Sequence, residues 1–274
     1  MRFYTTAHPH YCGIDLHAKQ MYVCVINQAG ETLFHANMKT DPNKLASAIA
    51  PYREDLVIRV ECLVTWYWLA DWCAQQGITF VLGHALYMKA ILGGKAKNDR
   101  IDSEKIARLL KAGMLPQAYA YPARMRATRD LLRRRMMFVR YRADLSAHVQ
   151  NTVSQYNLSP LNLRTDRRAD LPEIPAHFPD PVVRQMVTLD TTVIDHLDEQ
   201  LRVLEQDLAM KAKAHDAFAY HLLRSVPGIG RILALVILYE VEDIQRFPTV
   251  GVCVVCALSE VRQRIGRQEI RLLG

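Results

Sequence analysis

The first 115 residues alternate between short apolar runs and longer segments in which apolar positions have helical spacing. The runs are rich in β-branched and aromatic residues and predict five strands, over residues 11–16, 21–26, 32–38, 56–62 and 78–82. The longer segments predict helices, over residues 41–52, 64–76 and 100–112. Strands and helices in alternation are typical of an α/β protein.

The lengths of the connections predict how the strands pair. Short turns join the first three strands, so these should pair antiparallel, whereas helices join the later strands, which should run parallel. The predicted fold is therefore α/β, with a mixed five-stranded sheet in the order of the ribonuclease-H-like fold.

The middle of the chain predicts two long helices, over residues 124–156 and 183–215, with a proline-rich link between them. In the second helix, five apolar residues are spaced alternately by three and four positions, a heptad pattern. These residues are Ile194, Leu197, Leu201, Leu204 and Leu208. Two interpretations fit equally well: a helical hairpin packed on itself, or a coiled-coil arm that joins two copies of the chain.

A Pro-Gly-x-Gly turn at residues 227–230 separates a helical segment from an apolar helix over residues 231–239. This pattern predicts a helix-hairpin-helix, in which Gly228 and Gly230 let backbone N–H groups approach a phosphate. A simple tight turn between helices is the alternative. The predicted domains are a sheet domain (1–120), a basic helical hairpin or coiled coil (121–218) and a small helical domain (219–274).

Composition describes a globular chain with a localised basic excess. Half of the 274 residues are apolar and the net charge is +7, yet residues 89–142 alone hold fifteen basic and four acidic residues, a net of +11. Such a stripe is the electrostatic footprint of a nucleic-acid partner. Arg133, Arg134 and Arg135 are its densest part, and a solvated helix face is the alternative.

Several classes of protein are disfavoured. No apolar run approaches the ~20 residues of a membrane span, and residues 1–10 are polar and do not resemble a secretory signal, so we expect a cytoplasmic protein. The six cysteines mostly occupy apolar stretches and predict small buried side chains, not disulfides. Cys253 and Cys256 form a CxxC motif without the further ligands of a zinc site.

Two carboxylates interrupt apolar strands. Asp15 lies within the first predicted strand and Glu61 at the end of the fourth. In a ribonuclease-H-like sheet these strands are neighbours, so the two carboxylates should face each other. Adjacent carboxylates repel, and a cation between them relieves the repulsion.

A second pair of acids begins the next predicted helix. Asp99 and Asp102 are three residues apart and share one helix face, although stabilisation of the helix dipole would also explain them. Four carboxylates at one sheet edge suit two hard divalent cations in phosphoryl transfer. The neighbouring bases Lys95, Lys97 and Arg100 would hold a phosphate backbone.

These residues carry a family resemblance. The segments Gly13-Ile14-Asp15-Leu16-His17-Ala18-Lys19, Val60-Glu61 and Lys97-Asn98-Asp99-Arg100-Ile101-Asp102 resemble the DEDD transposases of the insertion sequence 110 family, which includes the Piv-type invertases. The resemblance implies a RuvC-like domain that binds Mg²⁺ through Asp15, Glu61, Asp99 and Asp102. It also implies recombination of a mobile element's DNA, a serine nucleophile in the C-terminal domain, homo-oligomers and, in some members, a structured guide RNA.

The C-terminal region departs from the family pattern. Arg264 stands where the family carries its nucleophilic serine, Ser259 lies too early, and the later Gly-Asn block is absent. We therefore interpret this chain as a truncated or degenerate copy whose nucleophile is unknown.

Three functions remain to be compared: an active recombinase, a non-catalytic nucleic-acid-binding remnant, and an ATPase of the actin or sugar-kinase type. The ATPase would need a glycine-rich phosphate turn after the first strand, where this chain has His17-Ala18-Lys19.

Overall fold

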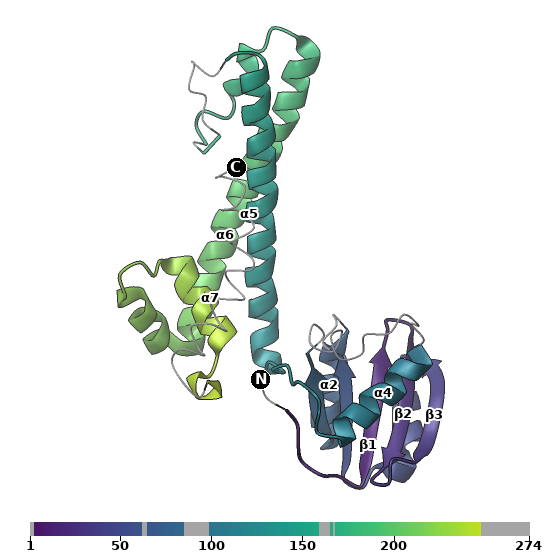
Figure 1. The fold of residues 1–274 in the computed structure, drawn as a ribbon. Coiled ribbons are helices and arrows are strands. Elements are labelled where there is room, and N and C mark those ends of the chain that lie inside the picture. Colours follow the sequence, from purple (N-terminus) through teal and green to yellow (C-terminus); the bar gives the residue numbers. More distant parts are fainter. Residues whose placement is uncertain (1–2, 62–64, 85–98, 159–164, 167, 248–274) are drawn as a thin grey trace. The chain divides into compact units, whose positions relative to one another are not determined.

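The computed structural model describes residues 3–61, 65–84, 99–158, 165–166 and 168–247 (Figure 1). It consists of two compact units, Met1–Ala123 and Arg124–Gly274, which we describe separately. Within the described residues, no helix has the length and apolar character needed to cross a membrane.

The first unit is built on a five-stranded mixed sheet in the order β3-β2-β1-β4-β5. Its strands are β1 (His10–Leu16), β2 (Gln20–Asn27), β3 (Thr32–Lys39), β4 (Leu56–Glu61) and β5 (Thr79–Gly83). The first three pair antiparallel, whereas β4 runs parallel to both β1 and β5. The predicted α/β class, strand pairing and adjacency of the first and fourth strands are confirmed.

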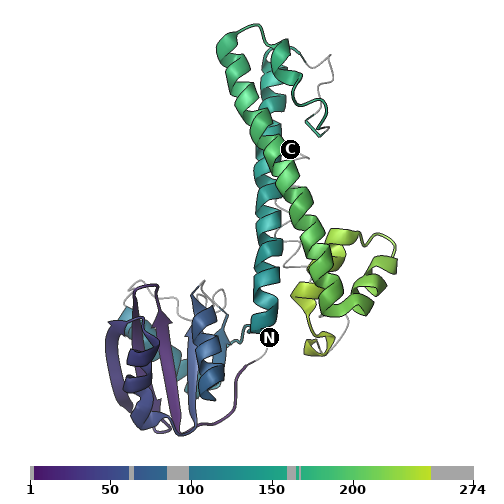
Figure 2. The ribbon, with the colours of Figure 1, turned by 180° about the vertical axis from the view of Figure 1, so that it is seen from behind.

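Helices cover both faces of this sheet. Helix α4 (Asp99–Lys111) lies across one face (Figure 1), where it packs on β1 and β2 and contributes Ile106, Ala107 and Leu110 to the core. Helices α1 (Pro42–Ile49) and α2 (Trp66–Gln76) cover the opposite face (Figure 2). A short 3₁₀ turn, η1 (Ala50–Tyr52), follows α1.

Local sequence signals explain where these helices begin and end. The Asp41 carboxylate accepts hydrogen bonds from the N–H groups of Asn43 and Lys44, and Pro42 occupies the first turn of α1, where its missing N–H is not needed. Gly77 ends α2 in the left-handed conformation, with φ of 66°.

Three cysteines of the first unit behave as the buried apolar side chains that the sequence predicts. Cys12, Cys24 and Cys73 are buried and unlinked, and burial raises the pKa of the thiol in each, to about 11 in Cys24 and about 12 in Cys73. The other three cysteines, including the CxxC pair, lie outside the described residues.

The second unit is helical. It contains α5 (Ala123–Gln155), α6 (Pro181–Ser225), α7 (Arg231–Val241) and the 3₁₀ turns η3 (Ile174–His177) and η4 (Ile244–Arg246). Helix α6 is interrupted at Asp216, whose φ of −154° and ψ of 89° are not helical. The Asp216 carboxylate accepts a hydrogen bond from the Ala219 N–H, so it caps a separate short helix that precedes the hairpin turn.

Helices α5 and α6 form a hairpin (Figures 1 and 2). Near one end, Val149 and Val153 of α5 share a core with Val187 and Ile194 of α6. Nearer the other end, α5 and α6 share a second core with α7. Four of the five heptad residues are buried and Leu204 is half-buried, so this apolar seam is used within the chain.

Candidate functional site

The carboxylates of β1 and β4 lie on neighbouring strands. The parallel register pairs Ile14 with Val60, so Asp15 and Glu61 follow side by side at the carboxyl ends of their strands. Both lie on the sheet face that α4 covers, because Asp15 has the same parity as Tyr11 on β1 and Glu61 the same parity as Val57 on β4, and Tyr11 and Val57 share a core with α4. Asp15 is only 8% exposed and Glu61 is half-buried, so this sheet edge concentrates negative charge in a partly dry environment.

Electrostatics tie a third carboxylate to this pair. The pKa of Glu61 is raised, mainly because burial disfavours its charged form and because Asp15 repels it; Arg59 opposes the rise and Asp102 adds to it. Carboxylates from β1, β4 and α4 are therefore close enough to disturb one another. Their oxygens are ligands of the kind that Mg²⁺ prefers, and a cation would relieve their repulsion.

Two basic groups accompany the carboxylates. Arg59 is fully buried on β4, and burial lowers the pKa of its guanidinium to about 9, against the opposing influence of Glu61. A Cβ atom on Gly83 would lie 2.0 Å from Arg59 Nη2, so the absence of a side chain on β5 makes room for this guanidinium. His17 places its Nε2 3.4 Å from Asp15 Oδ2.

Helix α4 rests directly on β1. A Cβ atom on Gly13 would lie 2.3 Å from the Ser103 carbonyl oxygen and 2.5 Å from the Ala107 nitrogen, both backbone atoms. The glycine two residues before Asp15 is therefore required by this close approach. The contact brings the helix that carries Asp102 against the strand that carries Asp15.

Several predicted site residues fall outside the description. Lys95 and Lys97 lie in the undescribed segment 85–98, and Asp99 begins α4 but its side chain is not described. Among the residues that are described, no three carboxylate, histidine or cysteine side chains are close enough to enclose a metal ion. Arg100 is exposed on the first turn of α4.

The predicted arginine stripe is largely engaged within the second unit. Arg135 binds Glu205 at 2.7 Å, and Arg133 lies 3.7 Å from Glu240. Arg134, between them, is exposed. The acids of α6 and α7 thus neutralise part of the charge that the sequence assigned to a nucleic-acid surface.

The Pro-Gly-x-Gly turn leaves its backbone accessible. Gly228 has φ of +86°, and a Cβ atom on Gly228 or Gly230 would meet no atom of the described residues within 4 Å. Gly230 precedes α7 without a side-chain cap. The N–H groups of the first turn of α7 therefore remain available to an anion.

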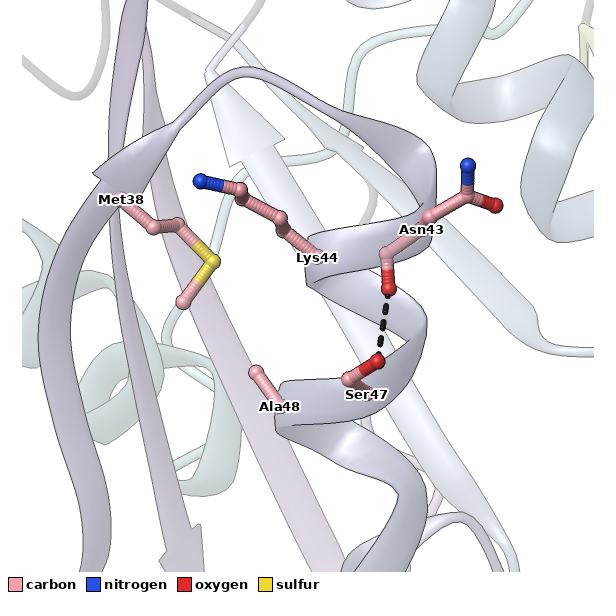
Figure 3. Close-up of a pocket in the computed structure, with 5 residues that line it drawn as sticks. All are labelled: Met38, Asn43, Lys44, Ser47 and Ala48. Carbon is pink, nitrogen blue, oxygen red and sulfur yellow. Dashed lines mark hydrogen bonds between the residues drawn. The ribbon is translucent and has the colours of Figure 1, made fainter.

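A shallow pocket lies away from the carboxylates. It is lined by Met38 of β3 and by Asn43, Lys44, Ser47 and Ala48 of α1 (Figure 3). The Ser47 hydroxyl donates a hydrogen bond to the Asn43 carbonyl, 3.0 Å away, so one of its few polar groups is already satisfied. Because α1 covers the opposite face of the sheet from α4, this pocket is not part of the carboxylate site.

Comparison with known proteins indicates a transposase. The family model of DEDD transposases of the IS110 type, described as "Transposase", matches residues 12–158, and that of the "Transposase IS116/IS110/IS902 family" matches residues 220–254. Because the first match covers more than half of the chain, this protein belongs to the IS110 family of transposases.

A curated relative has a similar sequence. The chain is 22% identical over 238 residues to the "Transposase for insertion sequence element IS1111A" of Coxiella burnetii (strain RSA 493 / Nine Mile phase I). The alignment covers 86% of this chain but 64% of the relative, so the chain spans a little under two thirds of that protein's length.

Proposed function

We propose that this protein is a metal-dependent recombinase that cuts and joins the DNA of an insertion sequence. The observation that carries the proposal is that Asp15 of β1 and Glu61 of β4 lie side by side at one sheet edge, where the pKa of Glu61 is raised chiefly by burial and further by Asp15 and by Asp102 of α4. The order of the strands supports a RuvC-like fold for the first unit. Family membership argues against the ATPase alternative.

In this proposal Asp15, Glu61, Asp99 and Asp102 hold two Mg²⁺ ions. When bound, such a pair activates the attacking group and stabilises the leaving oxygen in phosphoryl transfer. The chain's own contribution is to fix the carboxylates on rigid elements: two on adjacent strands and two on a helix seated on Gly13. Asp15 is shielded from water, which strengthens its interaction with a cation.

DNA of the element ends and target is the proposed substrate, with a structured guide RNA as a further partner. The proposed contacts to the nucleic-acid phosphate backbone are Lys95, Lys97 and Arg100 in the sheet unit and Arg134 on α5. Gly228 and Gly230 form the proposed phosphate contact of a helix-hairpin-helix, supported by the open backbone of that turn. Arg133 and Arg135 contribute to the same surface only if their pairs with Glu240 and Glu205 open.

A second copy of the chain is the proposed protein partner. Helix α6 also carries a second apolar stripe, which remains exposed although the heptad seam is buried. Its first residues are spaced by four, three and four positions. The stripe consists of Val182, Met186, Leu189, Val193, Val203 and Met210. The stripe is self-complementary when two copies of α6 run antiparallel, because Met186 then meets Met210 and Val193 meets Val203. A two-fold interface requires such self-complementarity.

Sedimentation tests this association. Leu189→Glu should shift the full chain to monomer, because Leu189 is 62% exposed and its replacement would place a charge in the interface. Thr188→Glu, exposed but off the stripe, is the matched control. Equal sedimentation of both variants and the parent chain would contradict the proposed interface.

A non-catalytic, nucleic-acid-binding remnant is the second candidate function. The observation in its favour is Arg264 at the position of the family's serine nucleophile, a position outside the described residues. Ser259 is then the remaining candidate, and Glu260 beside it would repel a scissile phosphate. On this candidate the metal site is intact but no covalent protein–DNA link forms.

Cleavage assays separate the two functions. With element-end DNA, cognate RNA and Mg²⁺, an active recombinase cuts DNA, and Asp15→Asn lowers the rate by about a thousandfold because several kcal/mol of charge stabilisation are lost. A remnant binds the same DNA without cutting it. A covalent adduct that disappears in Ser259→Ala would restore Ser259 as the nucleophile; a full-length relative, active on the same substrates, is the positive control.

A further inference from the structure

A histidine on the outermost strand holds the first turn of α4. His35 Nε2 lies 3.0 Å from the Arg100 carbonyl oxygen and 3.0 Å from Ser103 Oγ. The Ser103 hydroxyl donates to the same carbonyl, 2.9 Å away. Because a carbonyl oxygen only accepts, Nε2 must carry the hydrogen and donate, and it does so in both the Nε2–H neutral form and the cation.

This contact links segments 65 residues apart in the sequence. His35 pairs with Cys24 in the sheet, and Cys24 packs against α4 from the same face. Ser103 is fully buried, so the hydrogen bonds of its hydroxyl group are protected from water. The contact holds the backbone carbonyl of Arg100 and the side-chain hydroxyl of Ser103, both at the start of α4.

The same turn carries the two helical acids of the carboxylate site. Along α4, Asp99 immediately precedes Arg100 and Asp102 immediately precedes Ser103, so the backbone positions of both acids follow the rotation of this turn. The contact at Gly13 sets how closely residues 103 and 107 of α4 approach the sheet. Close packing of a helix backbone on a glycine does not by itself fix the rotation of the helix about its axis. A rotation of the helix would carry Asp102 away from Asp15 and Glu61.

We propose that His35 is a positioning residue: it sets the rotation of the first turn of α4 so that Asp102 faces Asp15 and Glu61. The proposal rests on the metal centre proposed above and adds a residue from β3 to its support. Among the described side chains, His35 has no hydrogen bond to a proposed ligand; it acts through the backbone of Arg100 and the hydroxyl of Ser103. Groups that orient metal ligands typically change metal affinity by 10–100-fold when removed.

Mn²⁺ binding by the full chain, followed by electron paramagnetic resonance, tests this role without requiring DNA cleavage. His35→Ala should weaken binding by about tenfold. His35→Gln should restore most of the affinity, because its amide N–H can donate from about the place of Nε2. Asn37→Ala, on the same strand but exposed, is the matched control and should bind like the parent chain. Asp15→Asn identifies the site by abolishing binding.

The outcomes separate this inference from the proposed function. No Mn²⁺ binding by the parent chain, or binding unaffected by Asp15→Asn, overturns the metal centre and the role of His35 with it. Binding that depends on Asp15 but is equal in His35→Ala overturns the role of His35 alone. A loss in His35→Ala that His35→Gln does not recover also overturns it, because a hydrogen-bond donor would then not be what the site needs.

Discussion

The two units of this protein treat charge in opposite ways. In the sheet unit, carboxylates of like charge are placed together in a partly buried position, and the pKa of Glu61 rises because of burial and because Asp15 repels it. In the helical unit, acids and arginines are matched: Glu240 binds Arg129 at 2.5 Å, and Glu205 binds both Arg135 and Arg231. Like charges held close together cost stability and indicate a functional site, whereas charges neutralised in ion pairs indicate a structural role.

The largest expected effect on stability comes from breaking a matched pair. Arg129 and Glu240 have side chains only 8% and 10% exposed, so Glu240→Ala leaves buried guanidinium groups without this acid. We expect a loss of about 3 kcal/mol in the free energy of unfolding of the helical unit, measured by urea denaturation. The double change Arg129→Met with Glu240→Leu should recover most of it. A loss of less than about 1 kcal/mol in Glu240→Ala would contradict a structural role for these ion pairs in the helical unit.

A second experiment addresses the seat of α4 in the sheet unit. Gly13→Ala forces a methyl group against two backbone atoms of α4 and should destabilise the sheet unit by about 2 kcal/mol. Gly77→Ala is the matched control, since its φ is positive but nothing lies within 4 Å of the added Cβ, and about 1 kcal/mol of backbone strain is expected. Equal effects in the two variants would contradict the close contact.

The predictions from sequence succeeded where the determining signal was local. Apolar runs, the Asp41-Pro42 start and the Gly77 end predicted the element types. Connection lengths predicted which strands are antiparallel and which are parallel, and the ribonuclease-H-like order predicted that β1 lies beside β4. They did not anticipate the ion pairs of the helical unit, because Glu240 lies 111 residues from Arg129 and the sequence around Arg129 carries no signal of this partner. For the same reason the role of His35, 65 residues from Arg100, has no local signal.

Arg134 and Arg135 should differ in their effect on nucleic-acid binding. As the exposed member of the Arg133–Arg135 run, it should contact phosphate directly, and Arg134→Ala should reduce the slope of log K against log salt by about 0.9 on duplex DNA. Arg135→Ala should instead destabilise the helical unit, because it removes a partner of Glu205. Filter binding over a salt series measures the slope, and an unchanged slope in Arg134→Ala would place the contact elsewhere.

The smallest effect is on the pH dependence of stability in EDTA, and its sign differs between the units. The pKa of Glu61 is raised in the folded chain, so its contribution becomes unfavourable as pH rises above about 4.5, and Glu61→Gln should remove this fall. Arg202 and Arg168 lower the pKa of exposed Glu199 to about 2, so its small contribution is present above pH 4.5 and is lost as pH falls toward 2. For each variant, Glu61→Gln and Glu199→Gln, the free energy of unfolding is subtracted from that of the parent chain and plotted against pH. Slopes of equal sign in the two plots would contradict the contrast between the units.

The long-range pairs of α5 also have a consequence for synthesis. The sheet unit can close once residue 118 has emerged from the ribosome, because the Ala118 N–H bonds the Leu82 carbonyl oxygen beside β5. Arg129 must wait for 111 further residues before Glu240 exists, which at ribosomal speeds takes about 6 to 22 seconds. Throughout that interval the nascent α5 presents apolar and arginine side chains to the cell, so protection by chaperones should matter more for the helical unit than for the sheet.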